Sequence, residues 1–263
     1  MPAQFWGQKT FCLLTGASQG IGRCFAVEFA RNFGAGSHLV LLARTTSGLE
    51  QTRSLIKSAN PQVTVHIHSV DLGDPDVELY KTILNSDAWA GESFDLKLLV
   101  HNAGSVGKAN TLSKDMDDHL EWNRYLSLNL YHVTSLTAEF LRSFPSGHRC
   151  IVNVTSLCAV KPFKSMGYYC VGKAAREMYF KVLADENPDL DIINYSPGPV
   201  DTDMVSQLIN EVQDEETKSS FITMKSTKTL VTVEQTTQKV IALLTSRGYK
   251  SGDRFDYYDQ LPQ

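Results

Sequence analysis

A buried strand that runs into a glycine-rich turn and then a helix constrains this 263-residue chain more than any other feature. Thr10–Thr15 is a short apolar run with the length of a strand, and a helical pattern follows through Arg23 to about Phe33. Glycines in such a turn let the backbone approach a pyrophosphate, whose charge the helix N-terminus meets. The sequence therefore predicts a dinucleotide phosphate site at Gly16, Ser18, Gly20, Ile21 and Gly22.

Predicted strands and helices alternate along the rest of the chain, which favours a parallel sheet with helices on both faces. Further strands are expected at residues 38–43, 61–70, 96–100, 151–154, 190–195 and 249–258, and helices at 49–58, 77–85, 117–144, 169–185 and 233–246. With 42% hydrophobic residues the chain can bury one large core. We predict an α/β fold, a single Rossmann-type domain over residues 1–263 with a doubly wound parallel sheet of about seven strands. The polar residues 205–230 suit a mobile lid over a cofactor.

Composition narrows the choice of partner. A formal net charge of -4 gives no electrostatic reason to attract nucleic acid or an anionic membrane, so a small-molecule partner is expected.

No apolar run could span a bilayer and Met1–Gly7 lacks the regions of a signal peptide, which predicts a cytoplasmic protein. The five cysteines form no Cys-x-x-Cys pair and are expected to be free, buried thiols. His66 and His68 share a strand face but have no third ligand, so no metal site is predicted.

The ends of the predicted strands indicate a nicotinamide dinucleotide with a 2′-phosphate. Arg44 and Thr45 follow the second strand, where an NAD-binding fold usually places a carboxylate. A guanidinium there would pair with a 2′-phosphate, to which Ser18 could add a hydroxyl, so the predicted cofactor is NADPH or NADP+. Asp71 is interpreted as an adenine contact, with a helix N-cap as the alternative. The remaining expected cofactor contacts after the third and fourth strands are Leu72, Asn102, Ala103 and Gly104.

Three residues in the second half of the chain form a candidate catalytic group. Ser156 follows the strand at 151–154, and Tyr169 and Lys173 stand four residues apart, so on a helix the phenol and the ammonium share a face. A cation at that distance favours a phenolate, which makes Tyr169 a candidate proton donor and acceptor. The Ser156 hydroxyl could hold a carbonyl oxygen while the phenol protonates it. Together they indicate carbonyl reduction, although a Tyr and a Lys at this spacing are also common on solvated helix surfaces.

Two further stretches are expected to complete the site. Asn129 is a polar residue in the apolar helix 117–144, where it could bend the helix or hold a water that feeds protons to Lys173. Ser196–Met204 contains two prolines in three residues, must be irregular, and stands at the carboxyl edge of the sheet. The residues assigned here to the cofactor are Val200, Thr202 and Met204, and those assigned to the substrate are Leu157 and Gly198.

This set of motifs resembles the short-chain dehydrogenase/reductase family. The matching residues, in chain order, are Thr15–Gly22, Asn102–Gly104, Asn129, Ser156, Tyr169, Lys173 and Pro197–Thr202. In that family the Gly-x-x-x-Gly-x-Gly spacing is the usual cofactor loop. The resemblance implies that Tyr169 is the general acid and that Lys173 modulates its pKa and binds the cofactor ribose. It also implies that Ser156 holds the substrate carbonyl and Asn129 holds a water.

Within the family, residues 154–164, 169–176, 194–204 and 250–259 are similar to members that reduce side-chain carbonyls of pterins. This closer resemblance implies a pterin substrate whose ring Asp256 anchors, NADPH as cofactor, and a homodimer. Gln19 departs from the arginine that such members often carry before the second glycine, which leaves Arg44 and Ser18 to select the cofactor. Two other functions stay open, a broad-specificity carbonyl reductase and a non-catalytic NADP(H) sensor.

Overall fold

The computed structural model describes residues 4–262 and is built around one parallel sheet. Part of Met1–Gly7, on which the prediction about a signal peptide rests, therefore lies outside the described residues. The seven strands of the described chain are ordered β3-β2-β1-β4-β5-β6-β7, and all neighbours run parallel. They are β1 (Thr10–Thr15), β2 (His38–Ala43), β3 (Thr64–Ser69), β4 (Leu96–His101), β5 (His148–Val154), β6 (Leu190–Ser196) and β7 (Arg254–Asp256). The predicted doubly wound α/β sheet is confirmed.

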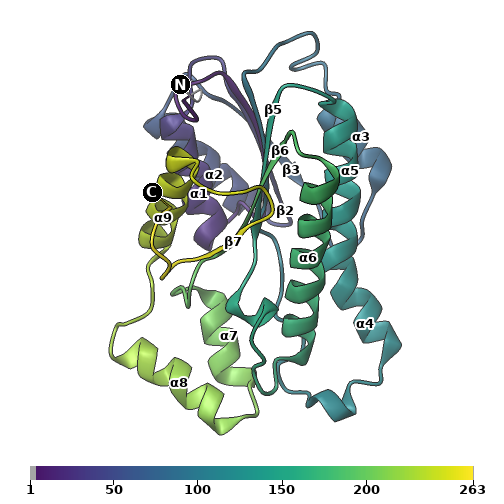
Figure 1. The fold of residues 1–263 in the computed structure, drawn as a ribbon, viewed down its shortest axis with the longest axis vertical. Coiled ribbons are helices and arrows are strands. Elements are labelled where there is room, and N and C mark those ends of the chain that lie inside the picture. The colour runs from purple at the N-terminus through teal and green to yellow at the C-terminus, as the bar shows by residue number, and fades with distance from the viewer. Residues whose placement is uncertain (1–3, 263) are drawn as a thin grey trace.

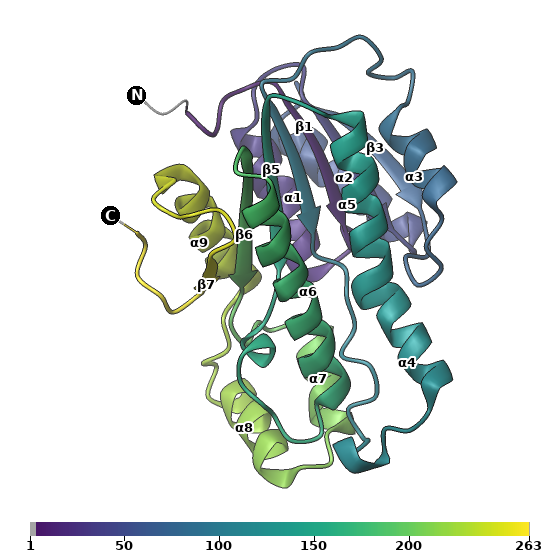
Figure 2. The same cartoon turned by 45° about the vertical axis from the view of Figure 1, so that its right-hand side comes forward.

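Helices cover both faces of the sheet (Figure 1). On one face lie α1 (Gly20–Asn32), α2 (Thr46–Ala59) and α9 (Val233–Ser246). On the other lie α3 (Val77–Leu84), α5 (His132–Ser143) and α6 (Gly167–Glu186), with α4 (His119–Leu126) continuing α5 beyond the sheet. Figure 2 shows α4 and α5 following one another alongside α6. No helix within residues 4–262 is long and apolar enough to cross a membrane.

The central strand β1 explains why helices pack on both faces of the sheet. All six of its residues are buried, and successive side chains point to opposite faces. Cys12 and Leu14 join the core cluster that contains α1 and α9, whereas Phe11 and Leu13 join the cluster that contains α3 and α5. A strand that is apolar on both faces is stable only between two layers of helix.

Residues 205–230, for which the sequence predicted a mobile lid and no particular element, are mostly helical. They form most of α7 (Asp203–Glu211) and α8 (Glu215–Ser226), which lie beyond the carboxyl ends of the strands (Figure 1). Helix α8 has no buried residue, so the apolar periodicity by which a sequence reveals a helix is missing there. Its N-terminus is nevertheless marked in the sequence by an N-cap residue, Asp214, whose carboxylate accepts a hydrogen bond from the Thr217 amide at 2.9 Å.

Two other elements differ from their predicted form, one by an irregular turn and one by its length. The predicted helix 117–144 contains a π-helical turn at Ser127–Tyr131 that separates α4 from α5. The predicted strand 249–258 is only three residues long, Arg254–Asp256, because the left-handed Gly252 (φ +88°) ends a turn just before it. Short as it is, β7 places Asp256 beside Ser196 at the end of β6.

Candidate active site

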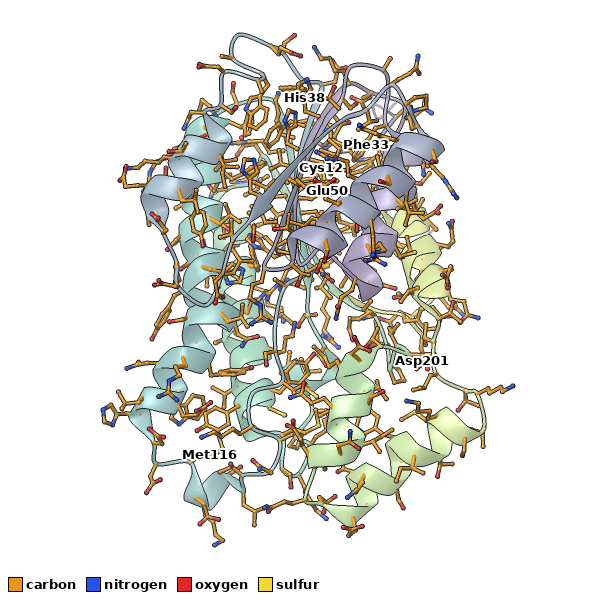
Figure 3. The ribbon with its side chains drawn as sticks, turned by 180° about the vertical axis from the view of Figure 1, so that it is seen from behind. Cys12, Phe33, His38, Glu50, Met116 and Asp201 are labelled. Atoms are coloured by element: carbon orange, nitrogen blue, oxygen red, sulfur yellow. The ribbon has the colours of Figure 1, made fainter. Side chains whose placement is uncertain are left out.

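A cavity of about 1210 Å³ opens at the carboxyl ends of the strands and is lined in part by residues of α7 and α8. In Figure 3, Cys12 lies among the packed side chains of the sheet, whereas Asp201, which lines the cavity, lies beyond the strands. At one end, here called the cofactor end, the cavity is lined by the loops that follow β1, β2, β3 and β4. At the other, the substrate end, it is lined by residues from β5, α6, α7, α8 and the C-terminal segment. Open α/β sheets bind ligands at this edge.

The glycine-rich loop forms the floor of the cofactor end. Gly16 has a left-handed backbone (φ +71°), and a Cβ there would lie 2.8 Å from the Asn102 amide nitrogen. A Cβ on Gly22 would lie 2.2 Å from the Gly16 carbonyl oxygen, so the loop closes only with glycine at both positions. The N-cap residue of α1, Gln19, makes no side-chain capping bond, and the first turn holds no acid. The helix N-terminus is therefore available to a pyrophosphate, and the loop fits a dinucleotide.

The other predicted cofactor residues lie where expected. Ser18, Gly20, Ile21, Leu72, Ala103 and Gly104 line the cavity, as do Thr45 and Asn102. Arg44 also lines it and is exposed, which leaves its guanidinium available to a phosphate. The Asp71 carboxylate lines the cavity and accepts a hydrogen bond from the Gly73 amide at 2.9 Å. The alternative that Asp71 caps a helix is wrong, because Asp76 caps α3.

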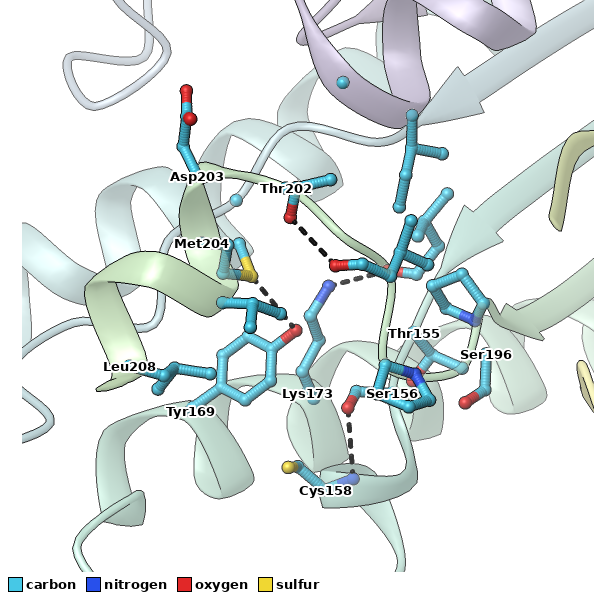
Figure 4. Close-up of a pocket in the computed structure, with 18 of the residues that line it drawn as sticks. Thr155, Ser156, Cys158, Tyr169, Lys173, Ser196, Thr202, Asp203, Met204 and Leu208 are labelled. Atoms are coloured by element: carbon cyan, nitrogen blue, oxygen red, sulfur yellow. Dashed lines mark hydrogen bonds between the residues drawn. The ribbon is translucent and has the colours of Figure 1, made fainter. Parts of the chain in front are cut away.

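The three predicted catalytic side chains meet at the boundary between the two ends (Figure 4). Tyr169 lies in the first turn of α6, and its hydroxyl is 3.9 Å from the Met204 sulfur. Lys173 follows one turn later, with its ammonium 5.5 Å from the centre of the Tyr169 ring and 2.6 Å from the Val154 carbonyl oxygen. The Ser156 hydroxyl begins a short 3₁₀ turn, Leu157–Ala159, by accepting from the Cys158 amide at 3.2 Å. The predicted helical spacing of Tyr169 and Lys173 thus brings both into the cavity.

Burial dominates the electrostatics of this group. It raises the pKa of the Tyr169 phenol above its usual value, while a hydrogen bond with Ser156 and the positive charge of Arg176 act in the opposite direction. Burial also lowers the pKa of Lys173 well below its usual value, and Arg176 adds to that effect. The direction of the Tyr169 pKa is therefore opposite to the one that favours a phenolate, because burial outweighs the hydrogen bond to Ser156 and the charge of Arg176. A phenol that keeps its proton at neutral pH is suited to donate it.

Asn129 lies behind the catalytic residues and does not line the cavity. It is buried in the π-helical turn, where its amide nitrogen donates to the Tyr125 carbonyl at 2.9 Å and its oxygen accepts from the Ser105 amide at 3.0 Å. A Cβ on Gly104 would be 3.1 Å from the Asn129 oxygen and 3.8 Å from the Lys173 ammonium nitrogen. Asn129 thus lies in the distorted turn, which agrees with the interpretation that it bends the helix. Its oxygen and the Lys173 nitrogen both lie within 4 Å of one point beside Gly104, and the role of holding a water stays a prediction.

The substrate end brings together residues from distant parts of the chain. Leu157 and Gly198, assigned to the substrate, line the cavity with Asp256 from β7 and apolar side chains from α7 and α8. Val200, Thr202 and Met204, assigned to the cofactor, line it as well, and Thr202 lies beside the glycine-rich loop, 3.5 Å from where a Cβ on Gly20 would be. The Asp256 carboxylate accepts a hydrogen bond from the Ser196 hydroxyl at 2.6 Å. Its side chain is 18% exposed, so it can still accept from a ligand.

Sequence reasoning missed Arg176, whose guanidinium is fully buried under the site. It donates to the Asn153 side-chain oxygen at 2.6 Å and to the Ala103 carbonyl at 3.0 Å, which ties the ends of β4 and β5 together. Its position one turn after Lys173 was a usable signal, since both side chains share a face of α6.

Comparison with known proteins agrees with this geometry. The family model for short chain dehydrogenase matches residues 10–242. Sepiapterin reductase from Bos taurus is 37% identical over 257 residues, covering 96% of each chain, and that from Xenopus tropicalis is 36% identical over 254 residues, covering 95% of this chain and 97% of the relative. A short chain dehydrogenase from Escherichia coli CFT073, solved in complex with NADPH, has a TM-score of 0.78 at 25% identity, covering 98% of this chain and all of that one.

The chain therefore belongs to the short-chain dehydrogenase family and is an oxidoreductase. Its residues fit a nicotinamide dinucleotide of the NAD(P) type, through the open helix N-terminus and the glycine-only loop. Among its relatives it is similar, over nearly its whole length, to sepiapterin reductases.

Proposed function

We propose that this enzyme uses NADPH to reduce side-chain carbonyls of pterins, namely sepiapterin and 6-pyruvoyl-tetrahydropterin, in tetrahydrobiopterin biosynthesis. One observation carries the proposal. A single cavity holds both the Ser156 and Tyr169 hydroxyls and, on β7, the Asp256 carboxylate. A pterin presents its 2-amino group and the adjacent ring N–H as two parallel donors, which one carboxylate can accept together. Similarity to the sepiapterin reductases supports the same substrate.

Each residue of the site has its own role in the proposed reduction. Asp256 binds the pterin ring, and Ser156 donates a hydrogen bond to the oxygen of the side-chain carbonyl. Tyr169 gives its proton to that oxygen as the carbonyl becomes an alcohol. Lys173, whose side-chain nitrogen lies 5.5 Å from the centre of the Tyr169 ring, would stabilise in its protonated form the phenolate left behind. Side chains of α7 and α8 line the same cavity and would shield the reacting groups from water.

The cofactor would be held at the other end of the cavity. The amides of the Gly16–Gly22 loop would bind the pyrophosphate, Asp71 the adenine, and Lys173 with Tyr169 the nicotinamide ribose. Bound NADPH supplies the hydride. Arg44 and Ser18 would select the 2′-phosphate. Gln19 is not available to help, because its amide donates to the Asp203 carboxylate at 3.2 Å.

The test is NADPH oxidation by the purified enzyme with sepiapterin beside a panel of simple diketones. We expect the highest kcat/KM with sepiapterin. Equal or better kcat/KM with the diketones would mean a broad-specificity carbonyl reductase, which the apolar side chains of Leu157, Met204 and Leu208 around the cavity would also accommodate. Cofactor binding without turnover of any carbonyl would mean a non-catalytic sensor.

We further propose that the enzyme is a homodimer. On α6, Val171, Met178 and Val182 are 49%, 58% and 48% exposed. They lie seven and four residues apart and so share one face of the helix. Helix α6 lies alongside α4 and α5 (Figure 2), and a second copy of the chain could cover its exposed apolar face. We expect sedimentation at twice the monomer mass of 29.3 kDa, and a mass near 29 kDa at micromolar concentration would contradict the proposal.

The cysteines support a cytosolic location, which we also propose. All five are free, with Cys12, Cys150 and Cys158 buried and Cys24 and Cys170 half-buried. Thiols that stay unpaired are the usual state in a reducing compartment. Fractionation of cells that make the protein tests this, and recovery outside the cytosol would contradict it.

A further inference from the structure

Arg254 connects the two groups that the substrate would touch, without lining the cavity itself. It is the first residue of β7, and its side chain is only 16% exposed. One guanidinium nitrogen donates to the Ser156 carbonyl oxygen at 3.1 Å. The other lies 3.5 Å from the Asp256 carboxylate. The same side chain therefore contacts the residue that holds the carbonyl and the residue that holds the ring.

A buried carboxylate fixes the Arg254 guanidinium in place. Glu177 on α6 is 3% exposed and accepts from Arg254 at 2.9 Å. It also accepts from the Thr155 hydroxyl and from the Lys181 ammonium, each at 2.9 Å. A carboxylate buried this deeply is stable only when it is paired, so Glu177 needs these donors. Arg254 is consequently held on one side by α6, independently of any ligand.

The register of β7 directs Arg254 and Asp256 to the same side of the sheet. They are two residues apart on a strand, whereas Phe255 between them packs into the opposite core cluster. Asp256 is also held from β6 by Ser196, at 2.6 Å. Two neighbours on different elements thus restrict where its carboxylate can lie.

We propose that Arg254 is a positioning residue that sets the distance between the Asp256 carboxylate and Ser156. A pterin must reach both groups at once, so this distance decides whether its carbonyl arrives at the Tyr169 hydroxyl. A small diketone touches only the Ser156 side and is much less sensitive to it. Arginine suits this role because its planar fork reaches three acceptors in fixed directions, which a lysine ammonium cannot do. The inference rests on the proposed pterin reduction.

The test uses the full-length enzyme with Arg254→Lys, which keeps the positive charge near Glu177 and Asp256 but loses the fork. The matched control is Lys181→Gln, which removes the other cation on Glu177 and contacts neither Ser156 nor Asp256. For each we measure kcat and KM with sepiapterin and with a simple diketone. Because misplacement by about 1 Å can cost 10²-fold, we expect Arg254→Lys to lower the sepiapterin-to-diketone ratio of kcat/KM by roughly tenfold or more. Lys181→Gln should keep that ratio within about twofold of the wild type.

A double variant separates positioning from a merely structural role. If Arg254 acts through Asp256, adding Arg254→Lys to Asp256→Ala should cause little further loss with sepiapterin. Should Arg254→Lys fold poorly, Glu177→Gln provides a second route, since it weakens the hold on the guanidinium and should lower the same ratio. Equal losses on both substrates, or additive losses in the double variant, would overturn the inference. Wild-type enzyme that does not reduce sepiapterin at all would instead overturn the proposed function, and the inference with it.

Discussion

The two ends of the cavity are built differently. The cofactor end is made largely of backbone at the ends of four neighbouring strands, β3, β2, β1 and β4, and a substituent as small as a methyl group does not fit at Gly16 or Gly22. The substrate end is made of side chains from β5, α6, α7, α8 and β7, whose contacts cross up to 98 residues of sequence, as between Arg254 and Ser156. The cofactor end, made of backbone, suits a ligand that many proteins share. At the substrate end, substitution of a few side chains can change which substrate is bound.

Removing the proton donor should have the largest effect and should separate the two ends most clearly. Tyr169→Phe keeps the packed ring but loses the hydroxyl, so turnover should fall by about 10² to 10⁴-fold. NADPH affinity, measured by fluorescence titration, should change far less. Near-normal turnover would show that another group donates the proton.

Lys173 lies at the boundary, so its loss should affect both ends. Lys173→Ala removes the ammonium beside the Tyr169 ring and a proposed ribose ligand, and we expect turnover and NADPH affinity each to fall by about tenfold or more. Lys181→Ala on the same helix is the control for loss of a lysine. Unchanged NADPH affinity in Lys173→Ala would remove the ribose role.

A substitution confined to the cofactor end should alter cofactor choice without altering substrate choice. A charged hydrogen bond from Arg44 to a 2′-phosphate is worth about 1.5 to 3 kcal/mol, so NADPH should be preferred over NADH by about tenfold or more in kcat/KM. Arg44→Ala should remove most of that preference, whereas Arg53→Ala on α2, outside the cavity, should keep it. Equal wild-type efficiency with NADPH and NADH would show that Arg44 does not select the phosphate.

Two cysteines, one beside Tyr169 on α6 and one in the core of the sheet, should differ in how their reactivity depends on pH. A hydrogen bond from Cys158 lowers the pKa of Cys170, next to Tyr169, to about 7, whereas burial raises the pKa of Cys12 in β1. The Cys170 thiolate is therefore present above pH 7 and lost below it. Alkylation of Cys170 by iodoacetamide should be up to about tenfold faster at pH 8 than at pH 6, with Cys12 unreactive at both. Mass spectrometry of the peptides shows which thiol reacts, and comparable labelling of Cys12 would contradict the account.

The sequence predicted the cofactor end better than the substrate end, for a physical reason. Gly16, Gly20 and Gly22 act through local backbone geometry, so their spacing alone indicates the loop. Two strands that lead into this end are short apolar runs whose predicted bounds match those of the structure, Thr10–Thr15 and His38–Ala43.

The substrate end depends on contacts that no local pattern encodes. Arg254 and Glu177 are 77 residues apart, and each alone looks like a solvated charge. Helix α8 buries no residue and therefore shows no periodicity. The Tyr169 and Lys173 spacing was readable, but the effect of burial on their pKa values required the packed structure.

Asp256 is the side chain proposed to make this a pterin enzyme. Asp256→Ala leaves two ring donors unpaired, a cost of about 1 to 3 kcal/mol, so the KM for sepiapterin should rise by roughly tenfold. The KM for a simple diketone should rise much less, and Asp253→Ala, an acid of the same segment outside the cavity, should alter neither. Measuring both KM values in the three enzymes is the most direct test. An unchanged sepiapterin KM in Asp256→Ala, or an equal rise for both substrates, would contradict the central claim.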